Sequence, residues 1–179
     1  ADFAAAVKRI KQAGPDLVYF GGTTQSGAPQ LVAALRKEGV GCPLLLPDGC
    51  YEPAFIAAAG AEALGAGSVF VTVGGINPAH LKGRGAEFVK RYKEKFDAAP
   101  GVAAVYGYEA AAVVLEALRA VGKGDREAVR KAVVGTKGFD KGVLGTWGFD
   151  ADGDTTLQPL TVTAVEKGTF RAVKVLGTG

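Results

Sequence analysis

The spacing of apolar residues predicts a chain in which amphipathic helices alternate with short strands. In the helical segments apolar residues recur three or four positions apart, and the strand segments are short apolar or alternating runs. Helices are expected over residues 3–13, 53–60, 102–121 and 126–134. Two further helices are expected, one that contains Leu31 and ends at Gly39, and one that contains Phe88 and Phe96. Strands are expected over residues 16–20, 43–46, 67–73, 143–149, 160–165 and 169–175.

The order of these elements indicates an α/β fold. Over the first two-thirds of the chain strands and helices alternate, which is typical of a doubly wound, mostly parallel sheet with helices on its faces. Near the C-terminus the pattern changes to strands joined by tight turns, so antiparallel strands are expected there. Apolar residues cover most of the circumference of the predicted helix 102–121, among them Val105, Val113, Val114 and Leu118. This predicts packing against more than one layer, or an exposed apolar surface where a layer is missing.

Composition excludes some classes of function. The 179 residues are 48% hydrophobic and 22% charged, which is sufficient for one substantial core. The net charge of +3 comes from 21 basic residues scattered among 18 acidic ones, without a basic run interleaved with aromatics, so nucleic-acid binding is not indicated. The chain has no methionine and opens within a helical pattern, so we expect a processed or cut chain, compatible with a removed leader.

The residue types that catalysis needs are poorly represented. The single histidine, His80, lies at a predicted helix start, and no nucleophile elbow, zinc motif or C-x-x-C is present. The acidic segment 150–154 has its glycine at the wrong position for a calcium loop and is expected to be a hairpin turn. Cys42 and Cys50 are separated by a predicted strand, which puts them beyond disulfide reach. No enzymatic activity, metal or cofactor is therefore expected.

The strongest candidate for a functional residue is Asp48. The apolar run 44–46 ends in Pro47, Asp48 and Gly49, and ligands of open α/β sheets bind at the carboxyl ends of strands. The alternative is turn chemistry, in which the carboxylate accepts hydrogen bonds from nearby backbone N–H groups. The glycine-rich loop 21–27 matches neither nucleotide-binding motif, but its backbone N–H groups suit a carboxylate or another small polar ligand.

Several segments occur in an order that resembles a known family. They are Asp2-Phe3 before a basic helix, 15–22 (PDLVYFGG), 47–49 (PDG), 106–111 (YGYEAA) and 145–154 (GTWGFDADGD). The chain resembles the C-terminal half of a branched-chain amino-acid-type (Leu/Ile/Val-binding-like) extracellular solute-binding protein, which has the type I periplasmic binding fold of ABC importers. The resemblance covers essentially the whole chain and implies a fragment of a two-lobe protein that closes on its ligand.

The resemblance also implies roles for particular residues. An acid at the position of Asp48 takes the α-ammonium group of the ligand, although the best-known members have the longer glutamate there. Thr23 stands where the family often has an aromatic contact, which implies a smaller or more polar side-chain pocket. Gly22 and Gly49 would flank the ligand. Tyr106, whose other interpretation is a buried helix aromatic, is the third side chain expected to contact it.

The resemblance further implies a domain organisation and partners. Residues 1–100 would form the ligand-binding lobe, incomplete at its N-terminus, 101–142 the helices that pack on the missing lobe, and 143–179 the antiparallel strands and crossover tail. The partners would be an amino acid or related solute, the missing N-terminal lobe and a membrane permease. The location would be periplasmic or extracellular, with a lipid anchor on a removed leader as one form. The alternatives are a ligand-sensing regulatory domain of the same fold that acts through a protein partner, and an enzyme with an unrecognised site.

Overall fold

The computed structural model describes residues 2–65 and 68–177. These residues form two compact units. Unit 1 runs up to Gly74 and includes Leu160–Leu176, and unit 2 contains Gly75–Pro159. Among the helices in the described part of the chain, none is long and apolar enough to cross a membrane.

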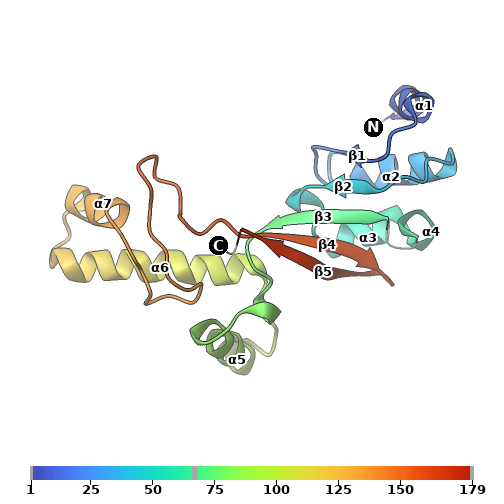
Figure 1. Cartoon of the computed structure of the whole chain (residues 1–179). Helices are drawn as coiled ribbons and strands as arrows, with labels where there is room; N and C mark the ends of the chain where they lie inside the picture. Colours follow the sequence, from blue (N-terminus) through green and yellow to red (C-terminus); the bar gives the residue numbers. More distant parts are fainter. Residues whose placement is uncertain (1, 66–67, 178–179) are drawn as a thin grey trace. The chain divides into compact units, whose positions relative to one another are not determined.

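Unit 1 is built on a five-stranded mixed sheet (Figure 1). The strands lie in the order β1 (Val18–Tyr19), β2 (Leu44–Leu46), β3 (Val69–Gly74), β4 (Leu160–Glu166) and β5 (Thr169–Leu176). The first three are parallel, and β4 and β5 each pair antiparallel with the strand before them. The predicted α/β fold, with a parallel part and antiparallel C-terminal strands, is therefore confirmed. The predicted start of β3 at Gly67 lies outside the described residues.

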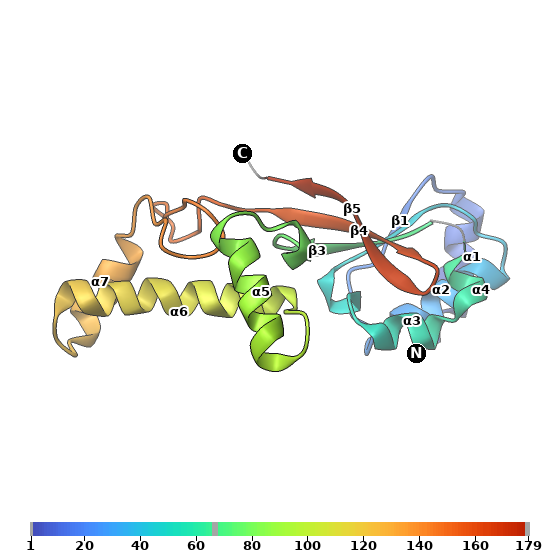
Figure 2. The same ribbon diagram turned by 90° about the horizontal axis from the view of Figure 1, so that it is seen from below.

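The helices of unit 1 cover the sheet because the connections between parallel strands must cross over it. The connecting helices are α2 (Ala28–Lys37), α3 (Pro53–Ala59) and the short α4 (Ala61–Leu64), which was not predicted. Helix α1 (Ala4–Ala13) precedes β1 and packs on α2. Both views show α2, α3 and α4 on the same face of the sheet (Figures 1 and 2). Leu44 and Leu46 of β2, Leu35 of α2 and Phe55 of α3 are all fully buried and form the centre of this core.

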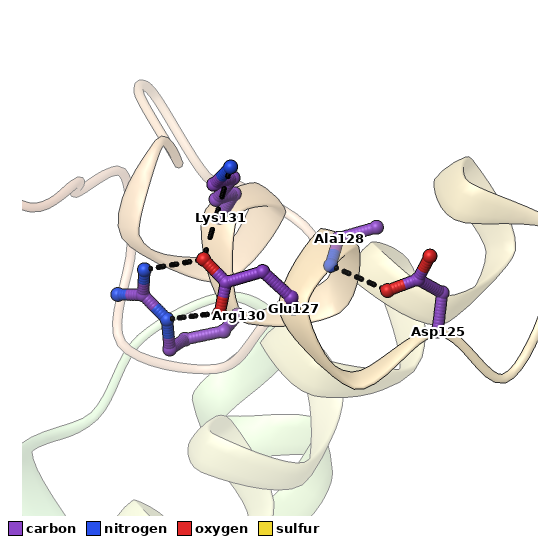
Figure 3. A network of polar contacts seen from close by, with 5 residues as sticks. All are labelled: Asp125, Glu127, Ala128, Arg130 and Lys131. Atoms are coloured by element: carbon purple, nitrogen blue, oxygen red, sulfur yellow. Dashed lines mark hydrogen bonds and ion pairs between the residues drawn. The ribbon is translucent and has the colours of Figure 1, made fainter.

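Unit 2 is mainly helical. It contains a 3-10 turn (Pro78–His80), α5 (Arg84–Phe96), α6 (Val102–Val121) and α7 (Arg126–Val134), and α7 packs on α6. Helix α7 begins where the Asp125 side chain accepts a hydrogen bond from the Ala128 N–H at 3.0 Å, which satisfies one of the free N–H groups of the first turn (Figure 3). Glu127 pairs with both Arg130 and Lys131 on the exposed face of the same helix (Figure 3).

The strand predicted over 143–149 is wrong. This segment forms only two isolated antiparallel bridges, between Phe139 and Trp147 and between Phe149 and Thr155. Its alternating pattern reflects side chains that pack on α6, because Trp147 and Phe139 form a buried cluster with Val113. The turn predicted after it is confirmed, since the Asp150 carboxylate accepts hydrogen bonds from the N–H groups of residues 152 and 154.

Candidate functional site

Asp48 lies immediately after β2, in a short 3-10 turn (Asp48–Cys50) at the carboxyl end of the parallel strands. Backbone groups close this turn, because the Cys50 N–H donates to the Pro47 carbonyl and the Tyr51 N–H donates to the Asp48 carbonyl. The Asp48 side chain is exposed and makes no hydrogen bond or ion pair with any residue that the structure describes. The turn therefore forms without help from the carboxylate, which leaves both carboxylate oxygens available to a solute.

A second loop joins Asp48 at the same edge of the sheet. Residues 22–27 follow β1, and the Thr24 N–H and hydroxyl group both donate to the Gly49 carbonyl, at 3.1 and 3.3 Å. The Gln25 amide donates to the Glu52 carboxylate at 2.9 Å. These contacts link the two loops, so Thr23 and Asp48 are brought together in unit 1 as expected for parallel neighbours. The Gln25–Glu52 bond was not predicted, since only the pairing of β1 with β2 shows that these residues meet.

Gly22 and Gly49 are required by close packing within this pair of loops. A Cβ atom at Gly49 would lie 2.7 Å from Thr23 Cγ2, and one at Gly22 would lie 2.5 Å from the Phe20 ring. Separations below about 3 Å are not tolerated without movement of the neighbouring groups. Gly49 thus allows the two loops to approach each other, and Gly22 allows its own loop to fold closely on Phe20 and Ser26.

Thr23 is held by reciprocal hydrogen bonds with Ser26. The Thr23 N–H donates to Ser26 Oγ at 2.7 Å, and the Ser26 N–H donates to Thr23 Oγ1 at 3.1 Å. The hydroxyl oxygen of Thr23 is therefore occupied locally, and its methyl group packs beside Gly49. These bonds fix the position of the side chain, and the smaller or more polar pocket expected at Thr23 stays a prediction.

Cys50 is buried beneath these loops. Its thiol lies 3.8 Å from the Gly22 carbonyl oxygen. Burial raises the pKa of the Cys50 thiol to about 11, and the negative charges of Glu52 and Asp48 add to the rise. The thiol is consequently protonated at neutral pH and is not an activated nucleophile. Both cysteines are free, as predicted.

Tyr106 belongs to unit 2, in the first turns of α6. Its ring packs on the cluster around Val105 and sits beside Gly75, where a Cβ atom would lie 2.6 Å from the ring. Its hydroxyl oxygen is buried without a hydrogen bond to a described residue. Burial raises the pKa of Tyr106, and the nearby Ile76 backbone lowers it in part. The packing accounts for the ring, so a ligand contact by Tyr106 stays a prediction.

Glu109 is a structural residue that the sequence analysis did not single out. It is only 3% exposed, and its carboxyl oxygens accept hydrogen bonds from the Val143 N–H at 2.5 Å and the Trp147 indole N–H at 2.6 Å. These bonds attach the irregular segment after residue 139 to α6. The available signal was an acidic residue within the apolar first half of α6, which is typical of a buried polar group with specific partners.

The described residues contain no group of three or more His, Cys, Asp or Glu side chains that could hold a metal ion. The geometry that remains is an exposed, unpaired carboxylate beside two linked loops at the end of a parallel sheet. Such an arrangement can accept hydrogen bonds from a cationic or hydrogen-bond-donating solute.

Comparisons with known proteins identify similar sequences. A family model described as "Periplasmic binding protein" matches residues 1–169. The Leu/Ile/Val-binding protein homolog 1 of Brucella abortus (strain 2308) is 31% identical over 168 residues, which are 93% of this chain and 43% of that protein. Homolog 2 of the same organism is 30% identical over 168 residues. The chain thus spans less than half the length of the curated relatives it matches.

Solved structures show the same fold. The leucine binding protein LivK of Thermotoga maritima has a TM-score of 0.84 and 27% identity, with 98% of this chain and 49% of that chain covered. The branched-chain amino acid transporter substrate binding protein LivJ of Streptococcus pneumoniae, solved in complex with isoleucine, has a TM-score of 0.77. That match covers 98% of this chain and 48% of the other at 24% identity, so it shows the fold alone.

Proposed function

Because the chain belongs to the periplasmic binding protein family, we propose that it takes part in binding a small amino acid or amide-like solute for delivery to the permease of an ABC importer. The observation that supports this most directly is the Asp48 carboxylate, exposed and without a partner at the carboxyl end of the parallel strands. An ammonium group is its natural counterpart, because a carboxylate that accepts a charge-assisted hydrogen bond binds more strongly than one that accepts a neutral donor.

The remaining site residues fit a small ligand. Thr23 contributes a short side chain fixed by Ser26, and Gly22 and Gly49 let the loops that carry Thr23 and Asp48 pack closely. We propose that these residues contact the ligand together with Asp48 and Tyr106. The two relatives named above as Leu/Ile/Val-binding homologues favour an aliphatic amino acid over a nucleotide or sugar. We propose no catalytic role for the chain, since the family is one of binding proteins.

The length of the relatives indicates that part of the complete protein is absent from this chain. We propose that residues 101–142 pack on that part, here called the N-terminal portion, and that residues 1–100 contribute the ligand-binding lobe. Val114, Leu115 and Leu118 of α6 support this, because they are 39–52% exposed although they are apolar. Two residues expected on this surface, Val105 and Val113, are instead buried within unit 2, because they face the segment that Glu109 attaches to α6. We also propose that the protein is located in the periplasm or outside the cell, with attachment through a lipid anchor as one form.

The first prediction concerns this exposed apolar surface. The chain alone should self-associate and bind an environment-sensitive dye such as ANS, because contiguous exposed apolar residues favour association. Addition of the N-terminal portion should suppress both effects. Sedimentation and dye fluorescence at tens of micromolar measure this; a monomer without dye binding would contradict the proposed interface.

The second prediction tests the binding function itself. By calorimetry, a protein completed with the N-terminal portion should bind one or more of leucine, isoleucine, valine and alanine, or a simple amide. The isolated chain should bind the same ligand about a hundredfold more weakly, because a buried small ligand loses part of its contacts when part of the site is missing. Absence of binding to all of these ligands by the completed protein would refute the proposed function. Equal affinity of the two proteins would instead show that the missing portion contributes no contacts.

A further inference from the structure

Unit 2 contains a hollow that the proposed function does not use. It has a volume of about 530 Å³ and lies along one face of α5, and Tyr108 of α6 and Val143 also line it. This hollow is called the α5 groove below. Figure 2 shows α5 crossing α6, the two helices that supply most of the lining residues. Its volume falls within the range of small-molecule sites, about 300–1,000 Å³.

Aromatic rings form the apolar part of the α5 groove. Phe88, Tyr92 and Phe96 recur every four residues, which places them on one face of the helix. The ring centroids of Tyr92 and Phe96 are 4.6 Å apart, and those of Phe88 and Tyr108 are 4.9 Å apart. Phe96 is 55% exposed and Tyr108 is 45% exposed, so the groove presents aromatic surface to solvent. A further ring could extend this cluster in a tilted or stacked geometry.

The charges around these rings are mainly positive. Arg84, Arg91 and Lys95 line the α5 groove, and Glu87 is its one acidic lining residue. Arg84 donates to the Lys141 carbonyl at 2.8 Å, and the Lys95 ammonium group lies 5.5 Å from the centre of the Phe96 ring. The Arg91 guanidinium group has no hydrogen bond or ion pair with a residue in the described ranges. A planar donor is therefore available beside the aromatic surface.

We propose that the α5 groove binds a small aromatic carboxylate. The ring of such a ligand would pack against Tyr92 and Phe96, and its carboxylate would pair with Arg91, for which a bidentate geometry is favoured. The net positive charge of the lining favours a monoanion over an amino acid, because the ammonium group of an amino acid would be repelled. The groove thus prefers a ligand chemistry different from that of the Asp48 site.

Phenylacetate and its neutral analogue phenylacetamide separate the two contributions of charge and ring. Titrated into the chain and followed by NMR, phenylacetate should bind about tenfold more tightly than phenylacetamide. Arg91→Gln should weaken phenylacetate binding about five- to tenfold and remove its preference over the amide. Tyr92→Leu should weaken both ligands, because it removes the ring surface and retains an apolar side chain. Equal binding of the two ligands, or an unaffected Arg91→Gln variant, would overturn the proposal.

Two control variants locate the binding. Lys90→Gln removes a charge from the same helix outside the groove, at a residue already 4.0 Å from Glu94, and should leave phenylacetate binding unchanged. Asp48→Asn should also leave it unchanged, which distinguishes this groove from the amino-acid site. The same titration in the completed protein should give the same result; loss of binding there would mean that the N-terminal portion occupies the groove and would refute the site.

Discussion

Replacing Gly142 by alanine is expected to lower the free energy of unfolding by about 2–4 kcal/mol. A Cβ atom at this position would lie 2.1 Å from both carboxyl oxygens of Glu109. The Glu109 side chain is buried and holds Val143 and Trp147, so it cannot move away without breaking its hydrogen bonds. The substitution therefore leaves a buried polar network partly unsatisfied, which is costly because the surroundings have a low dielectric constant.

Urea unfolding followed by tryptophan fluorescence measures this effect, since the single tryptophan of the chain, Trp147, belongs to the network. Gly107→Ala is the matched control. Gly107 lies within α6, and no atom comes within 4 Å of a Cβ added there, so alanine should be neutral or stabilising. In a Glu109→Ala background the cost of Gly142→Ala should largely disappear, because the clash partner is gone. Full additivity of the two substitutions would show that the carboxyl group is not the cause.

The regular elements of the fold could be predicted because their periodicity is local. The structure has α6 at Val102–Val121 and α7 at Arg126–Val134, as the apolar spacing indicated. The strand predicted over 143–149 failed for the opposite reason. Its alternation is produced by contacts with α6 and by the buried carboxyl group of Glu109, more than thirty residues away in the sequence. A period of two does not distinguish a strand from an irregular segment held by such distant contacts.

For the candidate site, the position of one residue could be predicted from the sequence, but the contacts around it could not. Asp48 could be placed because an acid and a glycine follow a short buried strand, and parallel strands bring their carboxyl ends to one edge of the sheet. The contacts that give the site its shape could not be predicted. The Thr24–Gly49 and Gln25–Glu52 hydrogen bonds depend on which strands are neighbours and on their register, which the chain does not reveal locally.

Asp48→Asn should lower the affinity of the completed protein for its amino-acid ligand about ten- to a hundredfold. The carboxylate makes no hydrogen bond or ion pair with any described residue, so its substitution removes a charge from the site without removing a contact within the fold. A charge-assisted hydrogen bond to an ammonium group is stronger than its neutral counterpart. Loss of this bond lowers the binding free energy by on the order of 1.5–3 kcal/mol, which corresponds to the expected change in affinity. Asparagine has nearly the same size and retains one acceptor oxygen, so the thermal midpoint should change little.

Calorimetric titration and thermal unfolding of the same samples separate a ligand role from a structural one. Asp16→Asn is a suitable control, because Asp16 precedes β1 and therefore lies toward the opposite edge of the sheet from Asp48. It removes the same charge and should alter affinity by less than about twofold, since exposed charges far from the ligand are screened by salt. If Asp48 served only the turn, the Asp48→Asn variant would show the reverse pattern: a lower midpoint of unfolding with an unchanged affinity of the folded fraction. An affinity equal to that of the unsubstituted protein, at an unchanged midpoint, would remove Asp48 from the binding site altogether.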